Sequence, residues 1–277
     1  MGAMDAREAE RNEWRIGDYE VGRLIGSGMI GVVAVARHYL THEVVCLKCM
    51  EVDKIIEKGL MRNVQMECDF HWELLGEDNI MPLKQLIVRP QEIIMVLPYI
   101  SGRDLYGQMR DIPDGHLDEA SSKQVFRQVF TALKACHARK IVHRDIKPEN
   151  IMIDHDLKVY LSDFGLAIRL PKHGTVKGRA GTPCYYPYEM VQQISYDCRS
   201  DLWCLGVLLF EMLYGCLPFK PDEKTGDYAG SIAKLEFEIP KKPRAVSRQA
   251  GELIKRLLVK QEDRASLEEI ESHPWLA

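Results

Sequence analysis

The pattern of hydrophobic and polar positions changes near residue 100. Before it, short runs rich in β-branched residues predict strands at residues 19–25, 32–36, 44–49 and 91–97. A polar, methionine-rich stretch at residues 53–75 interrupts these runs and has helical character. The first part of the chain is therefore expected to form a small, sheet-rich lobe.

After Tyr99 the pattern becomes helical. Side chains recur at spacings of three and four, which predicts one buried helix face, at Phe126, Val129, Phe130, Leu133 and His137. The apolar run at residues 202–217 contains Glu211 and is shorter than the roughly 20 residues that span a bilayer. We interpret it as a buried core helix and expect no membrane association. The joint between the two lobes is predicted near residues 97–102.

Composition and charge narrow the functional class. A chain of 277 residues with 46% hydrophobic residues is long enough for two modest lobes. A formal net charge of −4 argues against a partner nucleic acid, because phosphate contacts normally require a basic domain. The first residues lack the apolar stretch of a signal peptide, and residues 1–18 are interpreted as an extension or a cloning remnant.

Eight cysteines without a signal peptide indicate a reducing compartment, cytoplasmic or nuclear, and free thiols. Cys46 and Cys49 have the spacing of half a zinc site. If residues 44–49 form a strand, however, an offset of three places the two thiols on opposite faces. Free thiols are therefore favoured over zinc or redox chemistry.

A glycine-rich turn, "GSGMIGVV" at residues 26–33, follows the first predicted strand. Its spacing fits a dinucleotide-binding fingerprint, a phosphate-binding hairpin or a plain turn. The residues after Gly31 indicate a strand, whereas a dinucleotide site requires a helix there. A hairpin is favoured, and its glycines would let the backbone approach phosphates closely.

Lys48 lies one strand later, in the apolar run "VVCLKCM", and needs an anionic partner. Glu67 follows 19 positions later in the predicted helical stretch and can hold the ammonium toward a nucleotide. Glu57 and Glu73 are rival carboxylates in that stretch. The choice of Glu67 over these two residues depends on the register of the predicted helix.

Two motifs carry the most specific chemistry, "HRDIKPEN" at residues 143–150 and "DFG" at residues 163–165. Apolar strands flank both, and Asp145, Asn150 and Asp163 supply oxygen ligands of the kind that Mg²⁺ prefers. With these motifs in this order, the chain resembles the eukaryotic protein kinases.

The resemblance covers residues 19–276 and implies an α+β, bilobal kinase fold, with a small antiparallel-sheet N-lobe at residues 19–98 and a larger helical C-lobe at residues 99–277. It implies ATP and Mg²⁺ as cofactors. Lys147 and Thr182 are similar to residues of the serine/threonine class rather than the tyrosine class.

The same resemblance implies a role for each residue of the reaction. Asp145 orients the substrate hydroxyl and accepts its proton, while Asn150 and Asp163 bind the metal. Lys48, paired with Glu67, positions the α- and β-phosphates. The residues implied in nucleotide binding are Ile25, Gly26, Gly28, Gly31, Val33, Cys46, Lys48, Leu97, Pro98, Ile100 and Asp104.

One departure from the family pattern lies in "GTPCYYPYEM", where Pro187-Tyr188-Glu189 replaces Ala-Pro-Glu. Glu189 matches a glutamate that pairs with a buried arginine, here Arg264. Keeping both partners avoids an isolated buried charge. We interpret the sequence as a tolerated variant in an active enzyme.

A second departure lies in the activation segment, residues 163–189. Gly178 occupies the position where many relatives have a phosphorylatable threonine, so Arg144 lacks its usual phosphate partner. Thr175 is the nearest hydroxyl. Three alternatives stay open: Thr175 is the activating site, the segment is ordered without phosphate, or it is a basic loop with no regulatory role.

Within the family, "GTPCYYPYEM" and "SDLWCLGVLLFEMLYGCLPF" look most like the Aurora branch, then the polo-like and calmodulin-dependent kinases. A pseudokinase scaffold is the alternative, supported by Ile30, Gly178 and Tyr188. An Aurora-like kinase implies cell-division control at the spindle or centrosome, and permits an activator to dock on the N-lobe. Three acidic positions imply protein substrates with basic residues before the acceptor: Asp104, Glu149 and Glu211.

Overall fold

The computed structural model describes residues 15–240 and 246–277 and divides them into two compact units. Of the described residues, the first unit contains 15–68 and 82–99, and the second contains 69–81, 100–240 and 246–277. Most of the predicted N-terminal extension lies outside the described residues.

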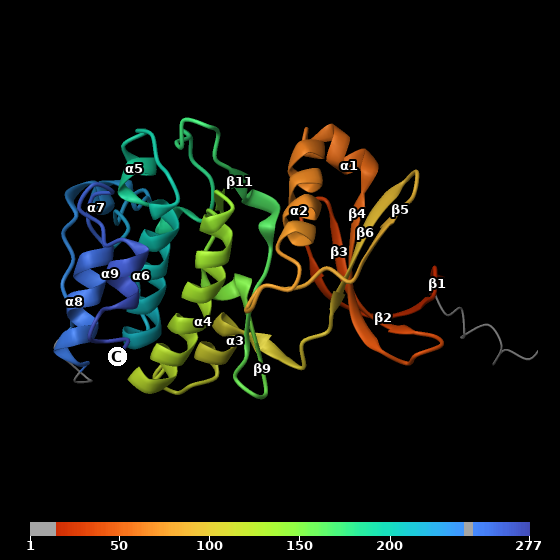
Figure 1. Ribbon diagram of the computed structural model, residues 1–277, viewed down its shortest axis with the longest axis horizontal. Helices are drawn as coiled ribbons and strands as arrows, with labels where there is room; N and C mark the ends of the chain where they lie inside the picture. The colour runs from red at the N-terminus through yellow and green to blue at the C-terminus, as the bar shows by residue number, and fades with distance from the viewer. Residues whose placement is uncertain (1–14, 241–245) are drawn as a thin grey trace, which may run out of the picture. The chain divides into compact units, whose positions relative to one another are not determined.

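The first unit is built on a six-stranded antiparallel sheet with the strand order β1-β2-β3-β4-β6-β5. The four strands predicted from β-branched runs are confirmed, and two short edge strands join them. The strands (Figure 1) are β1 (Arg15–Ile16), β2 (Tyr19–Ser27), β3 (Gly31–His38), β4 (Val44–Glu51), β5 (Gln85–Val88) and β6 (Glu92–Pro98).

Two helices interrupt the sheet between β4 and β5, as the polar stretch predicted: α1 (Val52–Glu57) and α2 (Met61–Glu73). Ile55 of α1 and Val64 of α2 are buried in one cluster with Met50 and Met95 of the sheet. Burial of this apolar surface holds the first turns of α2 to the sheet. The last residues of α2, from 69 onward, belong to the second unit.

The second unit is mainly helical, and its short strands form small antiparallel sheets. Its helices are α3 (Leu105–Arg110), α4 (Glu119–Ala138), α5 (Tyr188–Val191), α6 (Arg199–Tyr214), α7 (Ala229–Lys234), α8 (Arg248–Leu257) and α9 (Leu267–Glu271). Its strands are β7 (Gly102–Asp104), β8 (Ile141–Val142), β9 (Ile151–Asp154), β10 (Val159–Leu161) and β11 (Ile168–Arg169). The predicted α+β class, with an antiparallel-sheet unit and a helical unit, is confirmed.

Helix α6 forms the centre of the second unit, between α4 and α8 (Figure 1). Nearly all its residues are buried, which confirms the predicted core helix. Gly206 lets α8 approach closely, because a Cβ there would lie 2.7 Å from the Cβ of Leu257. Within residues 15–240 and 246–277, no helix has both the length and the apolar content needed to cross a membrane.

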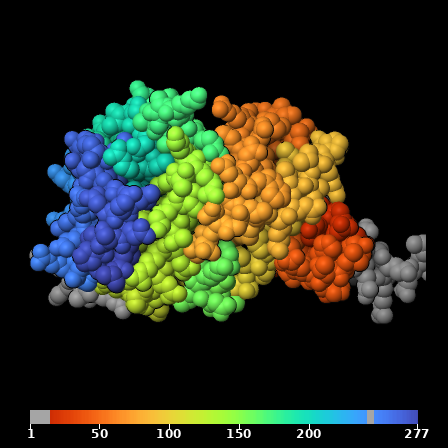
Figure 2. Space-filling view, viewed as in Figure 1, coloured from red at the N-terminus to blue at the C-terminus, as the bar shows by residue number. Residues whose placement is uncertain are grey.

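The end of the chain packs against α4. On the face drawn in Figure 2, the C-terminal residues lie beside α4, where Lys134 pairs with Glu271 at 2.5 Å and Arg127 donates to the carbonyl of Leu276. Trp275 is buried, with its ring edge-on to Phe126. These contacts hold the buried face of α4 between α6 and the chain end.

The predicted pair of Glu189 and Arg264 is confirmed. Both side chains are fully buried and share two hydrogen bonds, of 2.8 and 2.9 Å. Arg264 also donates to the backbone carbonyls of Arg199 and Val259 and lies over the ring of Trp203. The bidentate pair therefore joins α5 to the residues around α6 and α8.

We predict that Arg264→Met lowers the free energy of unfolding by about 3–5 kcal/mol, because it leaves the Glu189 carboxylate buried without its cation. Urea unfolding of the purified chain measures the loss. The control is Arg248→Met, which breaks the exposed pair with Glu252 and should cost at most about 1 kcal/mol. Equal losses in the two variants would contradict the prediction.

Candidate active site

The HRDIKPEN segment connects β8 to β9, and Asp163 follows β10 after one intervening residue, Ser162. Strands β9 and β10 pair in antiparallel register, with Ile151 opposite Leu161. Ser162 then donates from its backbone N and its hydroxyl to the carbonyl of Asn150, at 2.9 and 3.0 Å. The hairpin therefore brings Asp163 next to the end of the loop that contains Asp145.

The side chain of Asp145 is the centre of a polar network and is 6% exposed. Its Oδ2 accepts a hydrogen bond from the amide nitrogen of Asn150 at 2.9 Å and lies 3.0 Å from Nζ of Lys147. Its Oδ1 accepts from the hydroxyl of Thr182 at 2.8 Å, and that hydroxyl accepts from Lys147 at 2.9 Å. Three groups thus fix the orientation of one carboxylate.

The backbone of this loop is anchored by Asp201 of α6, whose side chain is completely buried. Oδ2 of Asp201 accepts from the backbone N of His143 and Oδ1 from that of Arg144, both at 2.9 Å, and Nε2 of His137 lies 2.9 Å from Oδ2. Burial alone would raise the pKa of Asp201, but the hydrogen bond and charge of His137 hold it below the ordinary value.

Phe164 fixes the turn that follows Asp163. Its ring is fully buried, with the rings of His71 and His143 packed edge-on at 5.1 and 4.9 Å between centroids. Asp163 itself has φ of 60°, a left-handed conformation that is uncommon for a residue other than glycine. The packing of Phe164 supports this backbone conformation.

Asn150 and Asp163 have the chemistry to bind a divalent metal. Because the amide nitrogen of Asn150 donates to Asp145, the amide oxygen is the atom suited to a hard cation. Among residues 15–240 and 246–277, no group of three or more His, Cys, Asp or Glu side chains forms a metal cage. The donor set fits Mg²⁺, which usually takes its other ligands from phosphates and water.

In the first unit, Lys48 of β4 and Glu67 of α2 form an ion pair with 2.6 Å between Nζ and Oε1. Glu67 is buried, and Lys48 is partly exposed. The rival Glu73 pairs instead with Arg169 in the second unit, and Glu57 ends α1. The register of the sheet places Lys48 opposite Val33, which in turn pairs with Gly26.

The glycine-rich turn is a hairpin between β2 and β3, closed by a bond of 2.8 Å from Gly28 N to Gly31 O. Gly31 is required by packing, since a Cβ there would lie 1.8 Å from the carbonyl oxygen of Cys49. Gly26 and Gly28 have room for a Cβ at ordinary contact distances. Packing explains the third glycine but not the first two.

The family of this chain follows from its similarity to known proteins. The protein kinase domain family matches residues 19–276. The chain belongs to the protein kinase family. The predicted class, a protein serine/threonine kinase, is confirmed by this match and by the relatives.

Three relatives illustrate the breadth of the match. Sucrose non-fermenting protein kinase 1 of Fusarium virguliforme is 36% identical over 97% of this chain, and CBL-interacting serine/threonine-protein kinase 5 of Arabidopsis thaliana is 33% identical over 94%. The chain spans only 38% and 58% of their lengths. Aurora kinase C of Mus musculus is 32% identical over 99% of this chain and 96% of its own length.

The other predicted nucleotide contacts of this kinase lie in both units. Cys46 of β4 pairs with Leu97 of β6, and Val45 pairs with Pro98. Asp104 caps α3, where its Oδ1 accepts from Gly107 N at 2.6 Å. The two remaining predicted contacts are Ile25, which is 43% exposed in β2, and Ile100, which is buried.

Cys46 and Cys49 both lie in strand β4, three positions apart, so their side chains point to opposite faces of the sheet. Burial raises the pKa of Cys46, and burial together with the charge of Glu92 raises that of Cys49 to about 11. Neither thiol is therefore activated for nucleophilic attack at neutral pH.

Glu149 and Glu211 lie close enough for their charges to interact. Glu211 of α6 accepts a hydrogen bond from the hydroxyl of Tyr185. Burial raises the pKa of Glu211, the bond from Tyr185 lowers it, and the charge of Glu149 raises it further. A carboxylate in this environment favours binding of a cation.

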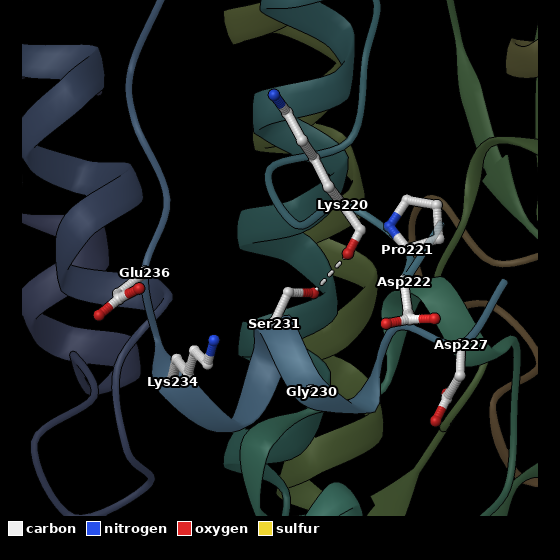
Figure 3. A pocket seen from close by; sticks show the side chains of 8 residues that line it. All are labelled: Lys220, Pro221, Asp222, Asp227, Gly230, Ser231, Lys234 and Glu236. Atoms are coloured by element: carbon white, nitrogen blue, oxygen red, sulfur yellow. Dashed lines mark hydrogen bonds between the residues drawn. The ribbon is translucent and has the colours of Figure 1, made fainter. Parts of the chain in front are cut away.

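A pocket of about 290 Å³ lies elsewhere on the second unit (Figure 3). Its lining combines two lysines with three carboxylates, and the hydroxyl of Ser231 donates to the carbonyl of Lys220 at 2.7 Å. The eight residues that line it are different from the predicted site residues, so it is separate from the kinase site.

Sequence reasoning missed two residues that organise the kinase site, Asp201 and Tyr196. The signal that could have identified Asp201 is an acidic residue immediately before the apolar run of α6. Such a carboxylate is expected to be buried, and a buried carboxylate requires several hydrogen-bond donors. Tyr196 carries no comparable signal, since its contacts connect segments far apart in the sequence.

The depressed pKa of Asp201 predicts a pH dependence of stability. A carboxylate whose pKa is lower in the folded state stabilises the fold above its unfolded pKa of about 4, and that contribution disappears as pH falls through the folded pKa. Asp201→Asn should therefore cost about 1–3 kcal/mol at pH 7, because buried donors lose their acceptor. The difference from wild type should shrink below about pH 4.

The measurement is urea unfolding of both proteins from pH 7 down to pH 3, about the range over which an aspartate titrates. Asp156→Asn in the exposed turn before β10 serves as the control. A wild-type advantage that grows as pH falls would contradict the prediction.

Proposed function

We propose that this kinase is catalytically active and transfers the γ-phosphate of ATP to serine or threonine hydroxyls of proteins. The observation that carries the proposal is the network around Asp145. Its carboxylate is held by Lys147 and Asn150 and accepts a hydrogen bond from an alcohol, that of Thr182. This is the contact that a substrate hydroxyl requires.

Each residue then has a defined task. Asp145 orients the substrate hydroxyl through its Oδ atoms and accepts its proton as the new P–O bond forms, while the bond from the γ-phosphorus to the bridging oxygen breaks and ADP leaves. Lys147 lies within 3.0 Å of the same carboxylate and neutralises charge that develops beside it. Positioning and charge stabilisation supply most of the catalysis in phosphoryl transfer.

Lys48 and Glu67 bind and orient the nucleotide phosphates. Glu67 fixes the position of the ammonium, which contacts the α- and β-phosphates when the nucleotide binds. The backbone of Gly26 and Gly28, where packing leaves room for a Cβ, approaches the phosphates. Asn150 and Asp163 hold Mg²⁺, which when bound screens the charge of the phosphates.

The substrates are proteins with arginine or lysine shortly before the acceptor. Glu149 is exposed, and the raised pKa of Glu211 reflects burial and the proximity of Glu149. A guanidinium placed between them forms charge-assisted hydrogen bonds with both carboxylates. Asp104 contributes negative charge, although one of its oxygens caps α3.

At the level of the subfamily we propose an Aurora-like kinase that acts in cell division, at the spindle or centrosome, with an activator that docks on the N-lobe. Aurora kinases from Mus musculus, Patiria pectinifera and Candida glabrata are among the relatives. Pro187 occupies the position that Aurora kinases also fill with proline. Sucrose non-fermenting protein kinase 1 and CBL-interacting serine/threonine-protein kinase 5 reach similar identity. The Aurora-like assignment therefore rests on the motif around Pro187.

We predict that Asp145→Asn lowers kcat about 10²- to 10⁴-fold, since the variant cannot accept the proton. Asp163→Asn should abolish transfer by weakening metal binding. Radiometric transfer from Mg-ATP to an arginine-containing serine peptide measures both, with Asp156→Asn as the matched control. Equal activity in all three variants would indicate a contaminating kinase, and a wild type that binds ATP without transfer would indicate a pseudokinase.

We also predict that the kinase prefers arginine two or three residues before the acceptor. Glu149→Gln should lower kcat/KM for such a peptide about tenfold, the effect of one lost charge-assisted hydrogen bond, and change little for a peptide with alanine there. Glu252→Gln, an exposed change on α8, is the control. A peptide array without arginine preference would refute the substrate class.

A further inference from the structure

Arg144 is held in place without any phosphate. Its backbone has φ of 68°, a left-handed conformation, and its N donates to Asp201. Its Nε donates to the carbonyl of Leu166 at 2.7 Å, and its Nη1 donates to the hydroxyl of Tyr196 at 3.3 Å. The guanidinium therefore connects the HRDIKPEN loop to the start of the activation segment and to Tyr196.

Tyr196 also binds the middle of the activation segment. Its backbone N and O exchange two hydrogen bonds of 2.9 Å with Val176, which form an isolated antiparallel bridge. The side chain of Tyr196 is completely buried. One residue thus contacts Arg144 through its hydroxyl and the activation segment through its backbone.

The segment on which Tyr196 lies is itself fixed. Asp197 accepts from the guanidinium of Arg199, and the backbone N of Asp197 donates to Oε1 of Gln261 at 3.1 Å. Arg199 donates to the carbonyl of Gln261 at 2.9 Å. Tyr196 can therefore act as a rigid support for the residues that it contacts.

The later part of the activation segment is bound through neutral acceptors as well. Arg179 donates to the carbonyls of Met190 and Val191 at the end of α5, at 3.3 and 3.2 Å. Gly181 has φ of 102°, and a Cβ there would lie 2.2 Å from the carbonyl oxygen of Arg144. These contacts hold the segment against the catalytic loop.

The backbone at residue 178 is unsuited to a phosphorylated side chain. Gly178 has φ of 107°, a conformation that residues with a Cβ rarely adopt. A threonine at this position would strain the backbone. The local geometry is therefore specific to glycine.

From these contacts we infer that Tyr196 is a positioning residue that holds Arg144 and the activation segment in their working arrangement without phosphorylation of that segment. The inference rests on the proposed kinase activity. Tyr196 acts through Arg144 and Val176 and does not contact the reacting atoms. Of the three alternatives for the segment, it selects order without phosphate.

The test uses the full chain treated with a phosphatase, with complete removal of phosphate verified by intact mass. Four proteins are compared: wild type, Tyr196→Phe, Thr175→Ala and Tyr160→Phe. The last removes a hydroxyl that donates to Asp154, in the β9–β10 hairpin outside the activation segment, and serves as the matched control. Each is assayed for kcat, for KM of ATP and for the rate of trypsin cleavage after Lys172, Lys177 and Arg179.

We expect phosphatase treatment, Thr175→Ala and Tyr160→Phe to leave kcat unchanged. Tyr196→Phe should lower kcat about tenfold, the effect of one lost hydrogen bond to a charged group, with KM for ATP unchanged. Trypsin should cleave its activation segment about tenfold faster for the same reason. Faster cleavage confined to the activation segment, with the rate of cleavage elsewhere in the chain unchanged, separates positioning from general destabilisation.

Two results would overturn the inference: loss of activity on dephosphorylation or in Thr175→Ala, or identical behaviour of Tyr196→Phe and Tyr160→Phe in both assays. The phosphatase experiment uses wild type alone, so it tests whether activity requires phosphorylation even if Tyr196→Phe does not fold. If wild type transfers no phosphate before or after treatment, the proposed function fails, and the trypsin comparison still tests the role of Tyr196.

Discussion

The buried carboxylate of Asp201 is the interaction on which the kinase site of the second unit depends. It accepts hydrogen bonds from consecutive backbone nitrogens, those of His143 and Arg144, and so determines the path of the loop that contains Asp145. A fully buried charge is costly unless donors surround it. Because α6 is itself packed among helices, this loop takes its position from the core of the unit.

At two glycine positions, close backbone contacts exclude a side chain. Gly181 brings the activation segment onto the carbonyl of Arg144, and Gly31 brings β3 onto the carbonyl of Cys49. At both positions a Cβ would overlap a backbone oxygen. Gly26 and Gly28 are different, because the structure leaves them space. Packing therefore explains the glycine at position 31 but not those at positions 26 and 28.

The sequence predicted those features that depend on local patterns. Runs of β-branched residues identified four strands of the sheet, helical spacing identified α4, and an apolar run identified α6. The resemblance to the protein kinases also implied the Glu189–Arg264 pair. Strand β5 was missed because its four residues form too short a run, and Tyr196 was missed because its partners lie 20 and 52 positions away. Pairing between distant segments leaves no periodic signal in a single sequence.

The way in which Arg144 is held affects how the enzyme can be controlled. A phosphate would bind the guanidinium with charge-assisted hydrogen bonds and could be added or removed. The hydroxyl of Tyr196 and the carbonyl of Leu166 are neutral and permanent, so each contact is weaker but always present. The Val176 bridge and the contacts of Arg179 compensate by spreading the attachment over the segment. The positions of Arg144 and of the activation segment therefore depend on contacts that a phosphatase does not remove.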